Sequence, residues 1–533
     1  MRRLLWCAPV ALSALLLWAA YPPMGEVCAL AFALAPLLVV ARVASPKAAA
    51  WSGFACGFLF WAGTLAWMPA IVKNNGPLPL VILGWAGLAA LCAAYFAAFG
   101  WLSARAWRRF GKGALACEPL LWAGLEWVRS WLFTGFAWNF LGTGLAGAPA
   151  LAAPARLGGV YLVSALVVLL NGVFATLACR LLAPMVGEER MGAWRPAAGW
   201  RRALETALPL GAILLAFGLA NATRPNDVEA PVPLRVALVQ RNAPCIFRAG
   251  AVREDPEEVF GRLLDVAAAA RPDLVVWAES ALAEFGPVGG AGAARAARLV
   301  ADKTGGGALL AGGDWKADGK VYNAAALYAA TNVQVYAKQH LVPFGEYIPF
   351  DKWITPLQKL SPVGVSLWPG EARTVALRTR AGAEIALAPL ICYEDTDPVL
   401  ARRAAKRGAQ AIVLITNDSW FSHSIEPVQH AAQAVLRAIE TGLPVVRVGN
   451  SGVTGLILPS GRARWLEDGE GKPLVDAAGT MVEHVLVAPH PVLTPYARLG
   501  DLPLAALFAA LLIALILPRR RARHEREMVY WSM

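Results

Sequence analysis

The sequence predicts a polytopic α-helical membrane part joined to an α/β domain of ordinary soluble composition. Of the 533 residues, 57% are hydrophobic and only 16% are charged, whereas soluble globular proteins have about 25% charged residues. The long apolar segments fill residues 1–220 and return near the C-terminus. Between them, in residues 221–497, short β-rich runs alternate with Ala-rich helical stretches. Such alternation is typical of α/β domains with buried sheets.

Eight apolar segments are long enough to cross a bilayer, which takes about 17–25 residues of helix. They lie near residues 4–20, 26–42, 50–72, 79–102, 114–136, 157–179, 204–220 and 502–518. The first has the basic start and apolar core of a signal peptide, but six more precede the α/β domain, so we expect it to be retained. The predicted domains are transmembrane helices 1–7 (1–220), the α/β domain (221–497), and transmembrane helix 8 with a basic tail (498–533).

The net charge of +12 could indicate a nucleic-acid-binding protein, but its placement argues for a membrane topology. Among the Lys and Arg residues that flank the predicted spans, most fall on one side, in alternate loops and in the tail "RRRARHERE". The short loops on the other side hold Lys73 and Arg156. Since Lys and Arg accumulate in cytoplasmic loops, we expect cytoplasmic termini and a periplasmic α/β domain. The prediction is a multi-pass protein of a bacterial inner membrane that binds no nucleic acid.

Two of the eight cysteines, Cys245 and Cys392, fall in the predicted outer domain. The other six lie in or beside apolar segments, where packing explains them. An oxidising compartment permits disulfides, but pairing would inactivate a nucleophilic Cys392, so both thiols are expected to be free. The six histidines show no zinc-ligand spacing, and neither a metal nor a diffusible cofactor is predicted.

Polar residues close three of the apolar runs. Cys392 ends the run in "LAPLICYEDTDP", Glu279 ends "VVWAES", and Lys338 ends "VYAK". Strand ends are where α/β folds build sites. The carboxylates of Glu394 and Asp395 would hold a proton on the thiol, so a cation is needed to lower its pKa. Lysine supplies that cation and can stabilise an oxyanion, and glutamate can serve as general base.

Each of these residues also has a simpler interpretation when it is considered alone. Cys392 could be a buried packing cysteine, Glu279 an ordinary carboxylate at a strand end, and Lys338 a solvated surface lysine. The three types together form a working catalytic set, which favours the functional interpretation.

Three segments, "VVWAES", "YAKQHLVPFGEYIP" and "LICYED", resemble the Glu–Lys–Cys signature of the nitrilase (carbon–nitrogen hydrolase) superfamily. With seven apolar segments before the domain and one after it, the whole chain resembles the apolipoprotein N-acyltransferase family. "GLEWVRSWLFTGFAWNFLG" in the fifth span, with "NDSWF" and "EPVQH" after the cysteine, is similar to further motifs of that family. The resemblance implies a nitrilase-like αββα sandwich for the α/β domain.

The same resemblance implies a role for each catalytic position. Glu279 matches the general base, Lys338 the oxyanion-stabilising lysine and Cys392 the nucleophile of the catalytic triad. Three further positions match supporting residues of the family: Glu346, Tyr393 and Glu394. Of these, Glu346 would orient Lys338 and assist the acid–base steps.

The implied reaction is acyl transfer in two halves, as used in lipoprotein maturation. Cys392 attacks an ester of a phospholipid, releases a lysophospholipid and keeps the fatty acyl chain as a thioester. The α-amine of a diacylglyceryl-cysteine on an apolipoprotein then accepts the chain, which gives ping-pong kinetics. The expected partners are the phospholipid donor, the diacylglyceryl-apolipoprotein acceptor and membrane lipid, and the chain is expected to be a monomer.

Two other functions stay open on the residues alone. A membrane-tethered amidase or nitrilase acting on a small C–N substrate would keep the three catalytic residues but would need only one span. A transporter with a sensory outer domain would need charged groups at mid-membrane, and the candidates are Glu126 and Arg129 in the fifth span. A structural ion pair is an equally good interpretation of these two residues, so no catalytic role is assigned to them.

The segment 350–371, rich in Trp, Leu, Ile and Pro, is predicted to be a mobile lid that reaches the membrane interface, where aromatic residues are favoured. Its predicted lipid contacts are Trp353, Leu357, Leu360 and Trp368.

Overall fold

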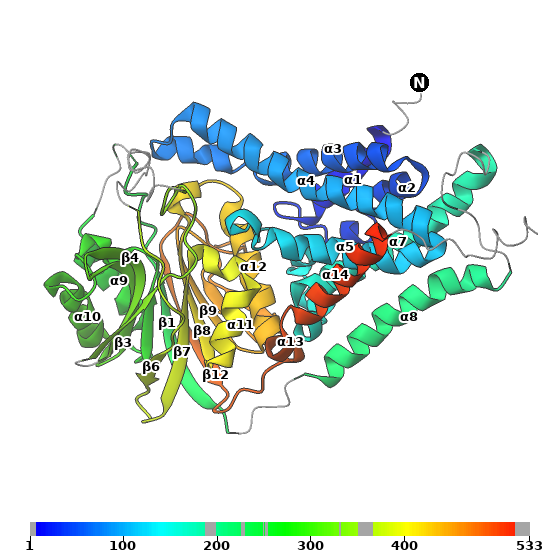
Figure 1. Cartoon of the computed structure of the whole chain (residues 1–533). Coiled ribbons are helices and arrows are strands. Elements are labelled where there is room, and N and C mark those ends of the chain that lie inside the picture. The colour runs from blue at the N-terminus through cyan, green and yellow to red at the C-terminus, as the bar shows by residue number, and fades with distance from the viewer. Residues whose placement is uncertain are drawn as a thin grey trace, which may run out of the picture.

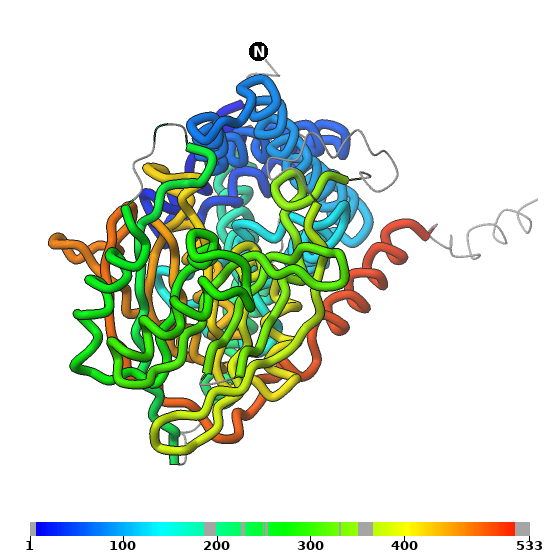
Figure 2. Tube along the Cα trace, turned by 90° about the vertical axis from the view of Figure 1, so that its left-hand side faces the viewer, coloured from blue at the N-terminus to red at the C-terminus, as the bar shows by residue number. Residues whose placement is uncertain are grey.

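The computed structural model describes residues 7–186, 194, 199–224, 230–248, 250, 254–329, 332–349 and 366–517. It consists of a helical bundle packed against an α/β domain (Figure 1). The bundle is made by α1 (Cys7–Ala20), α2 (Ala35–Val43), α3 (Pro46–Thr64), α4 (Leu78–Phe110), α5 (Ala114–Arg129), α6 (Pro149–Ala152), α7 (Ala155–Val186), α8 (Arg201–Ala222) and α14 (Leu502–Ile516). Viewed from the side, the N-terminal helices lie across one end of the α/β domain (Figure 2).

Helices form in each of the eight segments predicted to span the membrane. Among the described residues, four helical stretches are long and apolar enough to do so: Pro46–Asn74, Leu78–Arg129, Ala155–Met185 and Arg201–Ala222. Shorter apolar helices occupy Cys7–Ala20, Val27–Val43 and Leu502–Ile516. The stretch Leu78–Arg129 combines two predicted spans, because only the short turn Gly111–Gly113 separates α4 from α5. The structure thus has four candidate membrane helices, and eight spans stay a prediction.

A buried ion pair joins four helices of the bundle. Arg42 of α2 donates from Nη2 to Glu118 Oε2 of α5 over 2.9 Å. Glu118 also accepts 2.8 Å hydrogen bonds from Ser103 and Trp107 of α4, and Arg42 Nη1 donates to Thr176 Oγ1 of α7. Both charged side chains are fully buried, and burying charges is unfavourable unless they are paired and hydrogen-bonded.

The α/β domain contains two six-stranded sheets, with orders β12-β1-β2-β3-β4-β5 and β11-β10-β9-β8-β7-β6. The strands are β1 (Val232–Gln240), β2 (Leu274–Trp277), β3 (Ala308–Ala317), β4 (Lys320–Ala329), β5 (Asn332–Ala337), β6 (Val375–Arg378), β7 (Glu384–Ile391), β8 (Ala411–Asn417), β9 (Val445–Asn450), β10 (Gly455–Ile457), β11 (Ala463–Trp465) and β12 (Gly479–Val487). In each sheet three neighbouring strands are parallel, β1-β2-β3 and β7-β8-β9, and the outer pairs are antiparallel.

The domain has four layers, as the αββα prediction requires. Helices α9 (Pro256–Ala268) and α10 (Ala291–Thr304) cover the first sheet, and α11 (Pro398–Lys406) and α12 (Glu426–Thr441) cover the second (Figure 1). Apolar side chains from both sheets meet in one fully buried core, which includes Val236, Leu387 and Ile415. The continuous apolar runs of the sequence arise because these strands are covered on both faces.

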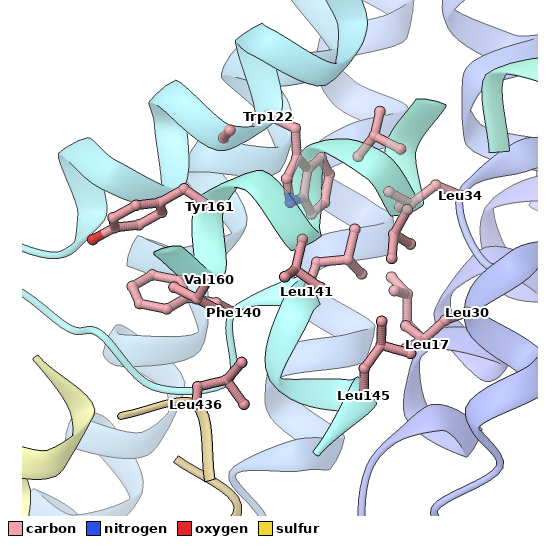
Figure 3. Packing of buried hydrophobic residues seen from close by; sticks show 14 of the residues in the cluster. Leu17, Leu30, Leu34, Trp122, Phe140, Leu141, Leu145, Val160, Tyr161 and Leu436 are labelled. Atoms are coloured by element: carbon pink, nitrogen blue, oxygen red, sulfur yellow. The ribbon is translucent and has the colours of Figure 1, made fainter. Parts of the chain in front are cut away.

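The outer layer formed by α11 and α12 packs against the bundle. Leu436 of α12 belongs to the same buried cluster as Phe140 and Val160 of the bundle (Figure 3). The indoles of Trp67 and Trp138 donate to Gln429 Oε1 of α12, each over 3.1 Å. The bundle and the second sheet therefore share one helical layer.

Some elements of the α/β domain differ from the sequence prediction. Strands β6, β11 and β12 lie outside the β-rich runs of the sequence, whereas α10 begins at Ala291, within the Gly/Ala-rich stretch 289–298. Strand β12 pairs with β1 along Val232–Gln240, at the edge of the sheet. Edge strands are half solvated and lack the continuous apolar signal of central strands.

Replacing Arg42 with Met should leave the Glu118 carboxylate buried without its cation. We expect the free energy of unfolding to fall by about 3–5 kcal/mol, measured by chemical unfolding in detergent. The double variant Arg42→Met/Glu118→Gln should recover most of that loss, because a neutral amide still accepts from Ser103 and Trp107. Lys112→Ala is the matched control: Lys112 is partly exposed and pairs with Glu205 at 2.8 Å, so its loss should cost about 0–1 kcal/mol. Equal stability of the Arg42→Met variant and the parent would contradict this role.

Candidate active site

Cys392 lies at the end of a central strand of the second sheet. Strand β7 ends at Ile391, and Cys392 begins a short 3₁₀ turn, Cys392–Thr396. Its φ of +52° falls in the left-handed region, which is uncommon for a residue other than glycine. Strained backbone of this kind concentrates at active sites. The thiol is free and half-buried.

The structure brings the predicted acid, lysine and cysteine together. Glu279 follows β2 and Lys338 follows β5, so both come from the first sheet, whereas Cys392 comes from the second. Lys338 Nζ lies 3.8 Å from Glu279 Oε1 and 2.9 Å from Glu346 Oε2. The thiol of Cys392 interacts electrostatically with both Glu279 and Lys338. Glu346, predicted to orient Lys338, is therefore its nearest carboxylate.

Asn323 is a site residue that sequence reasoning missed. It lies on β4, and its Nδ2 donates to Glu279 Oε1 and to Glu346 Oε1, each over 2.7 Å. One amide group thus holds two carboxylates that would otherwise repel each other. In the sequence it opens the ordinary strand run "NAAALYAA", and an asparagine at a strand end is too common to indicate this role.

Burial sets the charge states of the three central groups. It raises the pKa of the Cys392 thiol well above its usual range, and Glu279 adds to this while Lys338 opposes it. The expectation that lysine gives a low thiol pKa is therefore wrong. Burial also raises the pKa of Glu279, against the effect of Lys338. For Lys338, burial lowers the pKa, but Glu346, Cys392 and Glu279 together raise it above its ordinary value. The resting site holds a thiol beside an ammonium.

Glu394 ties the lysine strand to the cysteine turn. Its carboxylate accepts from the Tyr336 hydroxyl at 2.8 Å, from the Gln339 backbone N–H at 2.6 Å and from the Ile391 backbone N–H at 2.8 Å. Tyr336 and Gln339 flank Lys338, and Ile391 precedes Cys392. Glu394 is fully buried, so it acts as a clamp between the two sheets and does not face the thiol as a solvated charge.

Tyr393 connects the site to the bundle. Its ring stacks on Phe136, with centroids 6.4 Å apart and planes 20° apart, and meets His340 edge-on at 5.5 Å. Phe136 follows α5, in the loop that closes the bundle beside the α/β domain. The cysteine turn therefore lies directly over an apolar helical bundle.

Glu126 and Arg129 line one cavity inside the bundle, together with aromatic residues that include Trp61 and Trp122. Glu126 Oε1 accepts from the Leu141 backbone N–H at 2.7 Å and from the Trp122 indole at 2.9 Å. Arg129 Nη1 donates to the carbonyls of Phe136 and Trp138, at 2.7 and 2.9 Å. Each group fixes the loop after α5. Both residues therefore have structural contacts, but among the described ion pairs there is none between the two side chains.

One group of described residues has the spacing of metal ligands. Asp418, Glu426 and His430 offer ligand atoms that all lie within 4.8 Å of one another. However, Asp418 already accepts from Thr416 at 2.8 Å and faces the Arg447 guanidinium at 3.4 Å. The Arg447 guanidinium already supplies a positive charge to Asp418. The set therefore fits a cluster of paired charges better than a metal centre.

The predicted lid falls largely outside the described residues, including Trp353, Leu357 and Leu360. Trp368 is described: the Lys320 ammonium lies 4.4 Å from its ring centroid, and its backbone N–H donates to the Val321 carbonyl. The lid stays a prediction.

Comparison with known proteins covers both parts of the chain. The family model "Apolipoprotein N-acyltransferase N-terminal domain" matches residues 13–173, and "Carbon-nitrogen hydrolase" matches residues 235–489. The apolipoprotein N-acyltransferase of Azotobacter vinelandii is 34% identical over 503 residues, which is 92% of this chain and 90% of that protein. The chain belongs to the apolipoprotein N-acyltransferase family.

Other apolipoprotein N-acyltransferases match over similar lengths. The enzyme of Geobacter metallireducens is 32% identical over 85% of both chains, and that of Pseudomonas aeruginosa is 32% identical over 90% of both. The predicted resemblance is confirmed, and the two family models divide the chain as the bundle and the α/β domain do. The α/β domain is thus the nitrilase-like part of an apolipoprotein N-acyltransferase-family chain.

Glu394→Gln should weaken the clamp between the sheets, because an amide nitrogen would face backbone N–H donors. We expect a loss of about 1–3 kcal/mol in unfolding free energy, the cost of an unsatisfied buried donor. Hydrogen exchange should accelerate at the Gln339 and Ile391 amides. Tyr336→Phe removes a single hydroxyl donor and should cost about 1 kcal/mol with little change at Ile391. Unchanged exchange at both amides in Glu394→Gln would rule out the clamp.

Proposed function

We propose that this chain transfers a fatty acyl chain from a phospholipid, through a thioester on Cys392, to the N-terminal α-amine of diacylglyceryl-cysteine on apolipoproteins. The name shared by relatives that match about nine-tenths of the chain supports this activity. One structural observation supports the assignment of a lipid substrate. The Glu279–Lys338–Cys392 set lies where the α/β domain packs on the apolar bundle, through the contact of Tyr393 with Phe136. A small polar amide would need no such neighbour.

In the proposed first half-reaction, Cys392 Sγ attacks the ester carbonyl of the phospholipid. Because the thiol pKa is raised, the thiol needs a base, and Glu279 takes its proton as the S–C bond forms. Lys338 Nζ and the backbone N–H of Tyr393 stabilise the oxyanion of the tetrahedral intermediate. Glu279 then returns the proton to the leaving alkoxide, which departs as the lysophospholipid hydroxyl.

In the second half-reaction, the α-amine of diacylglyceryl-cysteine attacks the thioester carbonyl. Glu279 accepts a proton from the neutral amine as the N–C bond forms, and the same oxyanion donors act again. Glu279 then passes that proton to Cys392 Sγ as the C–S bond breaks, which restores the thiol and the carboxylate. Glu346 holds Lys338 in place and Asn323 holds Glu279 in place through both halves. Splitting the reaction at a covalent intermediate gives ping-pong kinetics.

The membrane arrangement belongs to the same proposal. Residues 1–220 would hold seven transmembrane helices, residues 221–497 the periplasmic catalytic domain, and residues 498–533 the eighth helix with a cytoplasmic tail. The placement of Lys and Arg residues supports cytoplasmic termini in a bacterial inner membrane. The four candidate membrane helices support a multi-pass chain, and the enzyme would act as a monomer.

The covalent intermediate is the first thing to measure. Intact mass after incubation with phospholipid should show one fatty-acyl adduct on the parent protein and on the control Cys28→Ala, and none on Cys392→Ala. A diacylglyceryl-cysteine peptide should discharge the adduct and appear as the N-acylated product. Discharge by water alone would instead indicate a lipase or an amidase, and the absence of any adduct would refute the phospholipid donor.

The pH dependence of acyl-enzyme formation should report Glu279. A general base must be deprotonated, so the rate should fall as pH drops through a pKa that burial holds above the usual 4.5. Asn323 lowers that pKa by its hydrogen bond, so Asn323→Ala should move the acidic limb to higher pH. Glu279→Gln should reduce the rate by about 10²–10⁴-fold. An Asn323→Ala profile that overlays the parent profile would count against Glu279 as the base.

A further inference from the structure

A buried cluster of charged and polar residues lies near Cys392. It comes from the second sheet and α12, whereas Glu279 and Lys338 come from the first sheet. Its members are Asp395, Thr416, Asp418, Glu426, His430 and Arg447, and each is at most 3% exposed. None of them has a step in the mechanism above. Buried charges are unfavourable unless they are paired, so a set of this size calls for an explanation.

His430, on α12, is the centre of this cluster. Its Nε2 lies 3.1 Å from Asp395 Oδ1, and its Nδ1 lies 2.9 Å from Asp418 Oδ1. The Nδ1–Asp418 contact is a hydrogen bond, and the Nε2–Asp395 contact is an ion-pair distance. Two carboxylates this close to the imidazole favour its protonated, charged form. Burial lowers the pKa of His430, but the two carboxylates raise it well above its usual range.

Of the two carboxylates that face His430, Asp418 acts on the Cys392 thiol, and Asp395 lies in the turn Cys392–Thr396 that begins with the cysteine. Asp418 accepts from Thr416 Oγ1 at 2.8 Å, and Asp418 and Thr416 both interact with the Cys392 side chain. The imidazole therefore ties the turn carrying the thiol to the end of the neighbouring strand β8.

The cluster also balances charge beside the thiol. Asp418 faces Arg447 at 3.4 Å as well as His430. Glu426 Oε1 lies 3.6 Å from His430 Nδ1, and burial and the nearby Asp418 raise the pKa of Glu426 well above its usual range, which favours its uncharged form. Two carboxylates then face two cations. Without the charge of His430, a net negative charge would lie beside a sulfur that must itself become negative when it gives up its proton.

We infer that His430 is a positioning residue for the nucleophile: held between Asp395 and Asp418, its ring fixes the Cys392 turn and neutralises the carboxylates beside the thiol. This rests on the proposed function only in so far as Cys392 is the nucleophile. The position of His430 on α12 adds a link to the bundle, because its ring lies 5.5 Å from that of Trp138. The charged groups of this cluster therefore come from the turns after β7 and β8, from β9 and from α12, and they add to the effects of Glu279 and Lys338 on the thiol.

The test follows the reactivity of the thiol and needs no lipid. Full-length protein in detergent is treated with iodoacetamide over a range of pH, and the modified Cys392 peptide is quantified by mass spectrometry. Removing a cation near a thiol raises the pKa of the thiol, by about one unit. His430→Gln should therefore be alkylated at Cys392 about tenfold more slowly at a given pH. The double variant His430→Gln/Asp418→Asn removes one charge of each sign and should recover most of that rate.

Gln433→Ala is the matched control for general damage to the helix. Gln433 is one turn further along α12, is buried, and donates to Asn139 Oδ1 at 3.1 Å. It should lose stability without moving the alkylation profile. The inference is overturned if folded His430→Gln reacts like the parent protein, or if Gln433→Ala shifts the profile as far. The alkylation experiment measures thiol reactivity and does not depend on acyl transfer. If no acyl adduct forms, the proposed function is refuted, but the inference about His430 is still tested.

Discussion

Lys338 can be buried only because carboxylates surround it, and this requirement organises the site. The side chain is 1% exposed, and Glu346 lies at 2.9 Å with Glu279 at 3.8 Å. Breaking a buried pair leaves an uncompensated charge that costs several kcal/mol, so neither carboxylate is independent of the lysine. Glu279 follows β2 and Glu346 lies in the loop after β5. The relative positions of the Glu346 loop, the ends of β2 and β5, and Asn323 are therefore fixed by the need to pair Lys338. This holds for any substrate.

A second network extends this order across the sandwich. Glu394 joins the end of β5 to the end of β7, and the His430 cluster joins the cysteine turn to β8 and α12. Together they fix Cys392 from both sheets, which is consistent with its left-handed backbone. A strained conformation persists only where the surrounding structure determines it strongly.

Much of the fold followed from the hydrophobic pattern. Strands β1 and β8 are buried on both faces and therefore carry continuous apolar runs, "LRVALVQ" and "AIVLIT", which belong to the β-rich runs of the sequence. Short or edge strands such as β6 and β12 carry no such signal. Glu279, Lys338 and Cys392 were found because each ends an apolar run. Asn323 and His430 were missed because their importance lies in partners distant along the chain, which no local pattern encodes. The thiol pKa was mispredicted because burial depends on the folded site.

Helix α12 has one further consequence, for how such a chain is made and how its parts can be exchanged. One side of this helix meets the cysteine turn, and another side contacts Trp67, Trp138 and Val160 of the bundle. Those partners are synthesised well before α12. The bundle is therefore synthesised before the helix that packs on it. An isolated α/β domain would expose the apolar surface of α12 that the bundle normally covers. A recombinant that exchanged only the bundle or only the α/β domain would need complementary residues at the α12 interface. We therefore expect the residues on the two sides of this interface to change together in evolution.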